Sequence, residues 1–97
     1  MVTERLPRVE IHYCTRCRWL LRAAWTAQEL LMTFCDEVRE VALVPGTGGL
    51  FEVKVEDELI WSRRDQGRFP ELKELKQLLR DRVAPGMELG HSDIKGE

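Results

Sequence analysis

Apolar and polar side chains alternate near the beginning of the chain. Val9, Ile11 and Tyr13 are separated by charged or polar residues, which is the period of two expected of a strand with one buried face. Pro7 comes just before this run, where its missing N–H costs least. The pattern therefore predicts a first strand over residues 9–13.

A helical spacing replaces this alternation from Thr15 to about Asp36. Apolar residues recur there at steps of three and four, namely Leu20, Ala24, Ala27, Leu31, Phe34 and Val38. A polar series follows the same steps elsewhere on the helix, namely Arg22, Thr26, Glu29 and Thr33. The segment is therefore predicted to be an amphipathic helix with a narrow polar stripe.

A short apolar run at residues 40–44 follows the helix, and a loop rich in glycine at residues 45–49 stops it. A continuous apolar run of this length is typical of a strand buried on both faces. The order strand, helix, strand predicts a parallel pair joined by a right-handed crossover.

An antiparallel hairpin is predicted next. Phe51, Val53 and Val55 alternate with charged residues, Asp57-Glu58 turns the chain, and residues 59–62 form the return strand.

A second helix is predicted to start at Pro70, which suits a first helical position. Basic Arg80 and Arg82 fall in its last turn, and Pro85-Gly86 ends it. One side of this helix is apolar, with Leu72, Leu75, Leu78 and Leu79.

The predicted fold class is α/β, with the order β-α-β-β-β-α. Because the first and third strands each carry one polar face, both helices are expected to cover one side of a four-stranded mixed sheet. The other side is expected to be wet, or alternatively to be the surface of a homodimer. We assign residues 1–86 to a single domain and residues 87–97, which have little apolar content, to a loosely ordered C-terminal tail.

Composition narrows the class of protein. The 97 residues are 43% hydrophobic and 33% charged, with a net charge of −2, a globular balance that argues against a nucleic-acid binder. The longest apolar stretch, residues 19–35, is interrupted by charges and is shorter than the roughly 20 residues of a membrane span. No export signal is visible, and three cysteines cannot form a complete set of disulfides. We therefore expect a cytoplasmic protein that binds neither nucleic acid nor membrane.

The chemistry of the chain centres on Cys14 and Cys17, which lie where the first strand gives way to the first helix. The N–H groups and dipole of a helix N-terminus favour an anion, and Arg16, Arg18 and Arg22 add positive charge. Thiols in such settings have pKa values lowered from about 8.5 to roughly 3.5–7.5. We therefore expect a catalytic pair that cycles between a dithiol and a Cys14–Cys17 disulfide.

Further arginines are expected close to these thiols. Three loops should meet at the edge where the parallel strands end, and one of them carries Arg63, Arg64 and Arg68. Guanidinium groups there would bind the carboxylates of glutathione or acidic side chains of a protein partner. The predicted thiolate-stabilising or substrate-binding residues are Arg16, Arg18, Arg64 and Arg68. No cofactor is expected, and glutathione would act as a co-substrate.

Inert packing or half of a zinc site are the alternatives for the cysteine pair. Zinc usually takes four protein ligands, and the chain adds only His12, His91 and the distant Cys35, so redox chemistry is preferred and no metal is expected. Cys35 lies about 27 Å along the helix from Cys17 and is expected to be a small buried apolar filler. His12 falls on the wet face and is expected to be a surface histidine.

The glycine-rich loop and Trp19 also lie near the cysteine pair, and the sequence indicates their roles less clearly. The loop at Gly46-Thr47-Gly48-Gly49 lacks the Gly-Lys-Ser/Thr of a phosphate cradle, and its glycines are expected to let the backbone pass close to the thiols. Trp19, two residues after Cys17, either shields the thiols or belongs to the core.

An ordered set of motifs extends from about Val9 to Val83. The motifs are Tyr13-Cys14-x-x-Cys17, Arg22-Ala23, Glu29-Leu30-Leu31 with Thr33-Phe34, Pro45-x-x-Gly48-x-x-Phe51-x-Val53, Gly67-x-Phe69-Pro70 and Leu75-Lys76. Together they resemble the selenoprotein W-like branch of the SelT/SelW/SelH (Rdx) family, in its cysteine-containing form. The resemblance implies a thioredoxin-like fold and a thiol-based redox role, with glutathione-linked chemistry and protein partners.

The family pattern bears on the two cysteines differently from a thioredoxin analogy. Animal relatives carry selenocysteine where this chain has Cys17, which makes Cys17 a candidate attacking group, whereas thioredoxins would assign that role to Cys14. Leu50 also stands before the third strand where thioredoxins place a cis-proline.

We therefore expect a small cytosolic thiol-disulfide redox protein, a possible thiol oxidoreductase in cell redox homeostasis, whose partners are protein thiols or glutathione. The alternative is a redox-switched protein-binding module without catalytic turnover, with the wet sheet face or the Trp-bearing helix as its interface.

Overall fold

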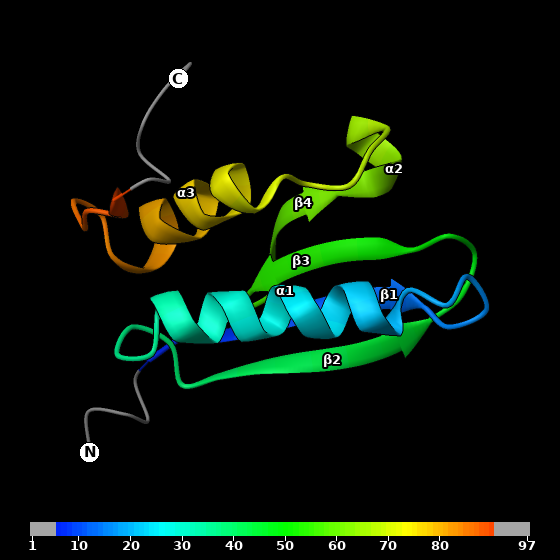
Figure 1. The fold of residues 1–97 in the computed structure, drawn as a ribbon, viewed down its shortest axis with the longest axis horizontal. Helices are drawn as coiled ribbons and strands as arrows, with labels where there is room; N and C mark the ends of the chain where they lie inside the picture. The colour runs from blue at the N-terminus through cyan, green and yellow to red at the C-terminus, as the bar shows by residue number, and fades with distance from the viewer. Residues whose placement is uncertain (1–5, 91–97) are drawn as a thin grey trace.

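The computed structural model describes residues 6–90, and Figure 1 shows its helices and strands. They are β1 (Arg8–Cys14), α1 (Leu20–Thr33), β2 (Glu40–Gly46), β3 (Phe51–Val55), β4 (Glu58–Ser62), α2 (Arg63–Gln66) and α3 (Leu72–Val83). The predicted order β-α-β-β-β-α is confirmed, with the short α2 as an addition.

The strands form one mixed sheet in the order β2-β1-β3-β4. β1 is parallel to β2 and antiparallel to β3, so that Val9 lies between Val41 and Val55. β3 and β4 form the predicted hairpin, whose turn residues Glu56 and Asp57 both have positive φ, as a tight two-residue turn requires. The four-stranded mixed sheet is therefore confirmed.

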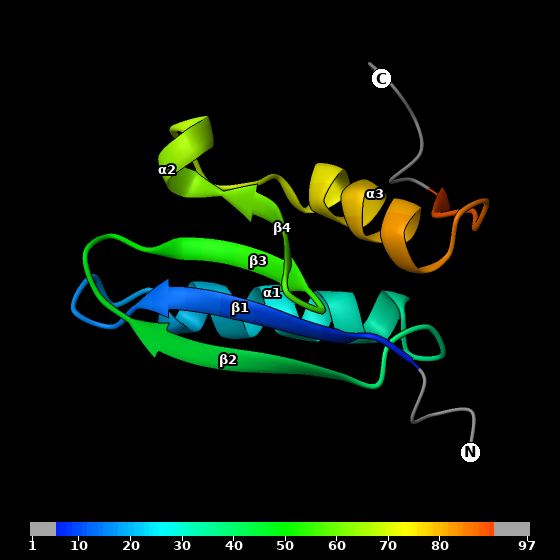
Figure 2. The ribbon, with the colours of Figure 1, turned by 180° about the vertical axis from the view of Figure 1, so that it is seen from behind.

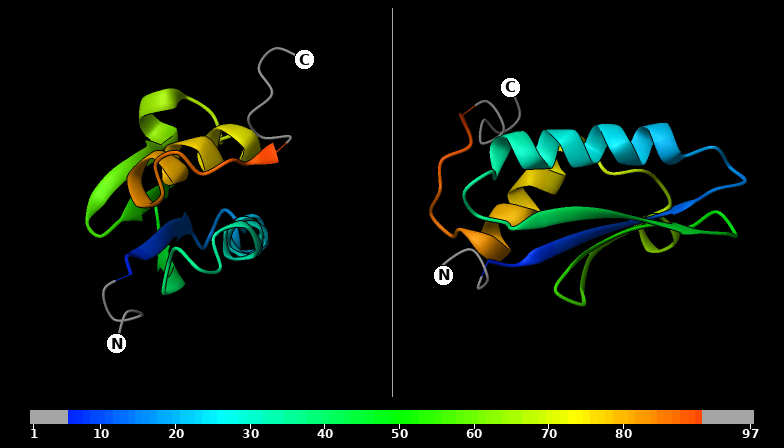
Figure 3. Two further views of the ribbon diagram at one scale, coloured as in Figure 1. Left: turned by 90° about the vertical axis from the view of Figure 1, so that its left-hand side faces the viewer. Right: turned by 90° about the horizontal axis from the view of Figure 1, so that it is seen from below.

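Both main helices cover the same face of this sheet (Figure 3). The inward residues of β1 and β3 pack with residues of α1 and α3 into one apolar core. Its members are Val9, Ile11, Tyr13, Ala23, Ala27, Leu30, Phe34, Val38, Phe51, Val53, Val55, Trp61, Leu75 and Leu79. The expectation that one face of the sheet carries both helices is confirmed.

Figure 2 shows the other face of the sheet in front of α1. This face carries paired charges. Arg8 forms ion pairs with Glu10 and Glu40, and the ring of His12 lies 2.8 Å from the Glu10 carboxylate. The hydrogen bond with His12, followed by that with Arg8, lowers the pKa of Glu10. His12 is therefore a partner of Glu10 on this open face.

β2 is less buried than predicted. The prediction that it is buried on both faces is wrong, because β2 is an edge strand that pairs with β1 alone. Leu43, for example, remains 37% exposed.

The first helix is also shorter than its sequence pattern. It begins at Leu20 and not near Thr15, because residues 15–18 form a turn in which Arg18 has a left-handed φ of 63°. At the other end the helix stops at Thr33, and Phe34 takes a fully buried position. The prediction that Cys35 is buried is wrong, because residue 35 lies beyond the helix and its side chain is exposed.

Local capping fixes the remaining helix boundaries. α3 begins at Leu72, two residues after Pro70, with a capping box between Glu71 and Glu74. α2 begins after Ser62, whose hydroxyl accepts a hydrogen bond from the Asp65 N–H, and ends at a left-handed Gly67.

The chain after α3 returns to the core. Met87 and Leu89 pack against it as partly buried side chains, and the Arg80 guanidinium donates to the Met87 carbonyl at 3.2 Å. Residues 91–97 of the predicted tail, with His91, lie outside the described residues. Within residues 6–90, no helix has the length and apolar character needed to cross a membrane.

Candidate redox site

The candidate site is the loop between β1 and α1, which holds a disulfide between Cys14 and Cys17. Cys14 is the last residue of β1, and the two Cα atoms are 5.3 Å apart. Their surroundings differ, because Cys14 is 1% exposed whereas Cys17 is exposed. One sulfur of the pair is therefore open to an incoming molecule and the other is sheltered.

Backbone hydrogen bonds hold this loop in shape. The N–H of Cys17 donates to Sγ of Cys14 at 3.3 Å, and the N–H of Arg18 donates to the Thr15 carbonyl at 3.0 Å. Thr15 ties the loop to the end of β2, because its N–H and hydroxyl both donate to the Gly46 carbonyl, at 3.0 and 3.2 Å. The site thus depends on two neighbouring parallel strands ending at one edge.

The hydrogen-bond donor closest to the pair belongs to the turn and not to the helix. α1 starts three residues after Cys17, with Trp19 as its N-cap and without a side-chain cap. The N–H of Cys17 is directed at Sγ of Cys14, and such a donor favours the anionic form of a sulfur when the disulfide is reduced. The first turn of the helix, which the sequence pattern placed at the cysteines, thus lies beyond them, and the donor to Sγ of Cys14 comes from the turn instead.

Aromatic rings and two guanidinium groups pack together next to the loop. The Trp19 and Phe69 rings meet edge to face at 4.8 Å, and Phe51 meets Phe69 at 5.2 Å. The Arg22 guanidinium lies 3.9 Å from the centre of the Phe69 ring, and that of Arg63 lies 5.0 Å from both the Trp19 and Phe69 rings. We call these five residues the aromatic–arginine cluster. Trp19 is thus partly buried against the core, as one of the two alternatives for it predicted.

Five arginines at this end of the molecule have no carboxylate partner among residues 6–90. They are Arg16, Arg18, Arg22, Arg63 and Arg64. Other arginines of the described chain are paired, such as Arg8 with Glu10 and Arg82 with Glu58. The overall charge of −2 therefore conceals an uncompensated positive patch around the cysteines. We call these five residues the redox-loop arginines.

The predicted site arginines have different environments. Arg16 and Arg18 are exposed in the loop itself, and Arg64 is exposed on α2, which lies at the same end of the sheet as the loop (Figure 1). Arg68 is bound at both ends of its guanidinium by Glu74, at 2.5 and 3.1 Å, and lies over the Trp61 ring at 4.9 Å. Its positive charge is thus compensated, in contrast to that of Arg64.

Arg63, which the sequence pattern placed in one of the converging loops, differs from Arg64 in its burial. Its Nε is buried and has no hydrogen-bond partner among the described residues. It directly follows Trp61 and Ser62, the buried end of β4, which accounts for the burial of this atom.

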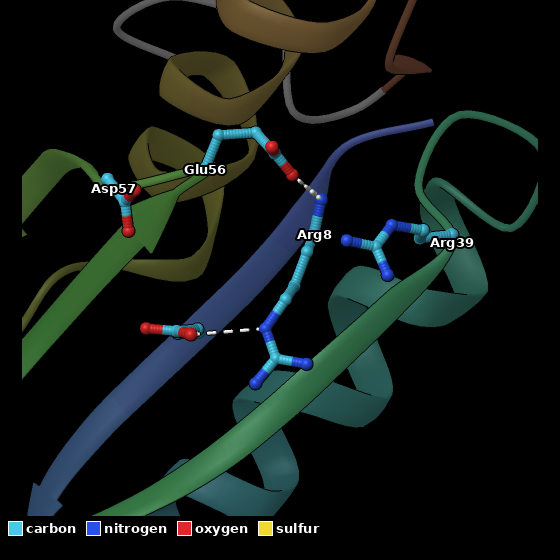
Figure 4. Close-up of a pocket in the computed structure, with 5 residues that line it drawn as sticks. Arg8, Arg39, Glu56 and Asp57 are labelled. Carbon is cyan, nitrogen blue, oxygen red and sulfur yellow. Dashed lines mark hydrogen bonds and ion pairs between the residues drawn. The ribbon is translucent and has the colours of Figure 1, made fainter. Parts of the chain in front are cut away.

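A separate depression of about 280 Å³ lies at the other end of β1 (Figure 4). Its lining is entirely charged, with Arg8, Glu10, Arg39, Glu56 and Asp57. Arg8 is already bound there, since its backbone N–H donates to Glu56 and its side chain to Glu10. In the described part of the chain, no three histidine, cysteine or acidic side chains come together as a metal site.

The sheet is mixed and carries both main helices on one face, and a Cys-x-x-Cys pair lies at the end of its first strand. These features define a thiol redox protein of thioredoxin-like fold. The model of the Rdx family matches residues 8–81, which is most of the chain, and the protein belongs to the Rdx family.

Solved structures agree with this assignment. A crystal structure of a protein from Bordetella parapertussis is 56% identical, with a TM-score of 0.79, over 80% of this chain and 99% of that one. A selenoprotein W-related protein from Vibrio cholerae is 51% identical, with a TM-score of 0.77, over 79% of this chain and 96% of that one. No curated protein matches the sequence.

Proposed function

We propose that the protein exchanges its Cys14–Cys17 couple with glutathione and with protein thiols, with Cys17 as the attacking group and Cys14 as the resolving group. The observation that carries the assignment is the difference in exposure, since Cys17 lies at the surface and Cys14 is 1% exposed. An incoming disulfide can reach the first sulfur and not the second.

The reaction proceeds in two exchanges. The Cys17 thiolate attacks one sulfur of a substrate disulfide, forms a mixed disulfide and releases the other half as a thiolate, which takes up a proton. The Cys14 thiolate then attacks the Cys17 sulfur, closes the Cys14–Cys17 disulfide and releases the second half. The substrate gains two electrons and the protein loses them, and two glutathione molecules return the couple to the dithiol as they form glutathione disulfide.

Glutathione suits the charge of this surface. It carries two carboxylates, and Arg16, Arg18 and Arg64 present guanidinium groups without acidic partners in the described chain. Carboxylates bind guanidinium groups through strong, charge-assisted hydrogen bonds. Arg68 would contribute less to this binding, because Glu74 already occupies it.

The free cysteine supports a cytoplasmic setting. Cys35 is exposed and unpaired, and such a thiol persists best where glutathione and related systems keep thiols reduced. We propose that the protein contributes there to cell redox homeostasis.

The test is the reduction potential of the couple in glutathione buffers, with mass spectrometry of the trapped adducts. Cys35→Ser is the background for all variants, so that the exposed thiol does not contribute. In this background Cys14→Ser should accumulate a glutathione adduct on Cys17, whereas Cys17→Ser should form much less adduct on Cys14. A potential far below the glutathione range together with no adduct in either variant would show a structural disulfide instead.

A redox-switched binding module remains the second candidate, because α1 exposes large apolar side chains such as Leu21 and Met32. Steady turnover of a disulfide substrate with glutathione distinguishes the two. Reactive thiols that complete only one exchange per protein molecule would favour the binding module.

A further inference from the structure

Helix α1 turns its polar stripe toward the rest of the protein. Thr26, in the middle of that stripe, is 5% exposed. Glu29 forms an ion pair with Lys76 of α3 at 3.4 Å, and Arg22 lies on the Phe69 ring. The side of the helix that would normally face water is thus used for contacts within the chain.

The side of α1 that faces away from the sheet is apolar instead. Leu21, Trp25 and Met32 follow one another at helical spacing and are 81%, 52% and 74% exposed. Leu20 and Leu31 are also exposed, on the flank of the helix toward β2. We call the row of Leu21, Trp25, Gln28 and Met32 the outer face of α1.

This concentration of exposed apolar side chains is specific to one surface. In the described part of the chain, the exposed large hydrophobic residues are Leu20, Leu21, Trp25, Leu31, Met32, Leu43 and Leu59. Five of them belong to α1, and Leu43 shares the helix-covered face of the neighbouring β2, since it pairs with the buried Ile11. A contiguous apolar surface of this kind marks a contact with another macromolecule.

We propose that the outer face of α1 is covered by a second copy of this chain, with the two α1 helices antiparallel across a two-fold axis. The charges flanking the helix argue for a copy of the chain itself. Arg16 and Arg18 stand before α1 without acidic partners among residues 6–90, and Asp36 and Glu37 follow its end. An antiparallel pair brings each positive end against a negative end, whereas a parallel pair would bring like charges together.

The outer face is also complementary to itself. Leu21 and Met32 lie at equal distances from the middle of the 14-residue helix, and so do Trp25 and Gln28. A two-fold axis through the middle therefore places Leu21 opposite Met32 of the partner subunit and Trp25 opposite Gln28 of the partner subunit. The large and small side chains can then interdigitate at a usual helix separation of about 8–10 Å.

The size of the surface predicts a weak dimer. A helix of this length extends about 21 Å, and one helix pair buries less than the roughly 800 Å² per partner of a standard stable interface. The net charge of −2 opposes association only slightly. We therefore expect monomer and dimer in an equilibrium that depends on protein concentration.

The dimer adds residues of the second copy to the rim of the redox loop. Asp36 of the partner subunit and Glu37 of the partner subunit lie toward Arg16 and Arg18, which flank Cys17. Carboxylates in this position compete with acidic substrates for the same arginines. Association is therefore expected to slow the reaction of Cys17 with anionic disulfides.

Sedimentation equilibrium over a wide concentration range tests the association, with the reduced full chain. The wild-type mass should rise from one chain toward two, and Trp25→Glu should raise the dissociation constant at least about tenfold, because a carboxylate enters the buried row. Leu59→Glu, at an exposed apolar position on β4, is the matched control and should leave the constant unchanged. A wild-type protein that stays monomeric throughout, or that associates equally well with Trp25→Glu, overturns the proposal.

A charge exchange tests the antiparallel orientation and does not depend on the folding of the Trp25 variant. The double substitution of Arg16→Glu with Arg18→Glu should weaken association. Adding Asp36→Lys and Glu37→Lys to the same chain should restore it, because the flanking charges are then complementary again. Equal association of the wild type and both variants would show a parallel pair, because like charges then meet at each end of the helix pair in all three chains. Neither experiment involves thiol exchange, so their failure leaves the proposed redox function untouched.

Discussion

The backbone N–H of Cys17 lies 3.3 Å from Sγ of Cys14, so the exposed cysteine of the pair donates to the sheltered one. Only two residues separate them in the sequence, yet Cys17 is exposed to solvent and Cys14 is buried. The disulfide thus joins an exposed sulfur, that of Cys17, to a sheltered one, that of Cys14, within a single turn.

The reduced protein should show this asymmetry in alkylation by iodoacetamide. Cys17 is expected to react faster than Cys14, because only its side chain is at the surface. Mass spectrometry of partially alkylated protein measures both rates. Cys35 is a built-in control, since it is exposed but stands apart from the redox-loop arginines, and Cys17 should react several-fold faster than Cys35 at neutral pH. Equal rates at these two exposed cysteines would show that the loop does not activate its thiol.

The redox-loop arginines should select substrates by charge. Replacing Arg16, Arg18 and Arg64 together by Gln is expected to slow reduction of glutathione disulfide by roughly threefold to tenfold, and more at low ionic strength. Reduction of the cationic disulfide cystamine should become faster in the same variant. Stopped-flow measurement with both substrates separates a charge effect from a general loss of reactivity.

Lys54→Gln is the control for that experiment. Lys54 is a cation of the open sheet face, directly across from Glu10 in the β1–β3 register, and is remote from the loop. Its removal changes the net charge without touching the site. If the triple substitution slows the reduction of both disulfides equally, the turn itself has been damaged.

The pairing of Glu74 with Arg68 should contribute to acid stability. The Arg68 guanidinium, opposed by partial desolvation, holds the pKa of Glu74 below its usual value of 4.5. As the pH falls, the unfolded chain therefore binds the proton first, so the stabilisation is complete above this value and is lost as the pH falls through the lower folded pKa.

Glu74→Ala should lower the free energy of unfolding by about 0.5–2 kcal/mol at neutral pH, through loss of the ion pair and the capping box. The difference from wild type should shrink below about pH 4.5, the usual pKa of this carboxyl. Urea unfolding at several pH values measures both effects. Glu88→Ala, at an exposed residue after α3, should show neither.

The packing of α3 should be sensitive to truncation at its buried row. Leu75 is fully buried in the core, whereas Leu78 is only partly buried against it. Leu75→Ala is expected to cost about 2–5 kcal/mol, and Leu78→Ala clearly less. Similar losses at both positions, measured by chemical denaturation, would mean that α3 packs with a different face toward the sheet.

Features that depend on neighbours in sequence were predictable from the chain alone. The alternation in β1 and β3 reports which side chains of each strand share a face, and the hairpin between Val55 and Glu58 is a local event. The Cys14–Cys17 spacing likewise identified the disulfide, because one short turn brings both residues together. Order of elements, sheet type and the candidate loop follow from such local signals.

Features that depend on the final arrangement were not predictable in this way. An apolar run such as residues 40–44 does not indicate whether the strand it forms will pair with one neighbouring strand or with two. β2 pairs with one. The periodic pattern of α1 separates a polar and an apolar side but does not tell which side meets α3. The same holds for Arg68, whose partner Glu74 lies on another element.

The strand order β2-β1-β3-β4 also determines when the sheet can assemble during synthesis. β1 leaves the ribosome before both of its partners, residues 40–46 and 51–55, so its pairing waits until these later segments have been made. Such non-local pairing is slow compared with closing a turn. The Cys14–Cys17 ring includes four consecutive residues and closes at little entropic cost, so a nascent chain can be oxidised at this pair before the sheet around it exists.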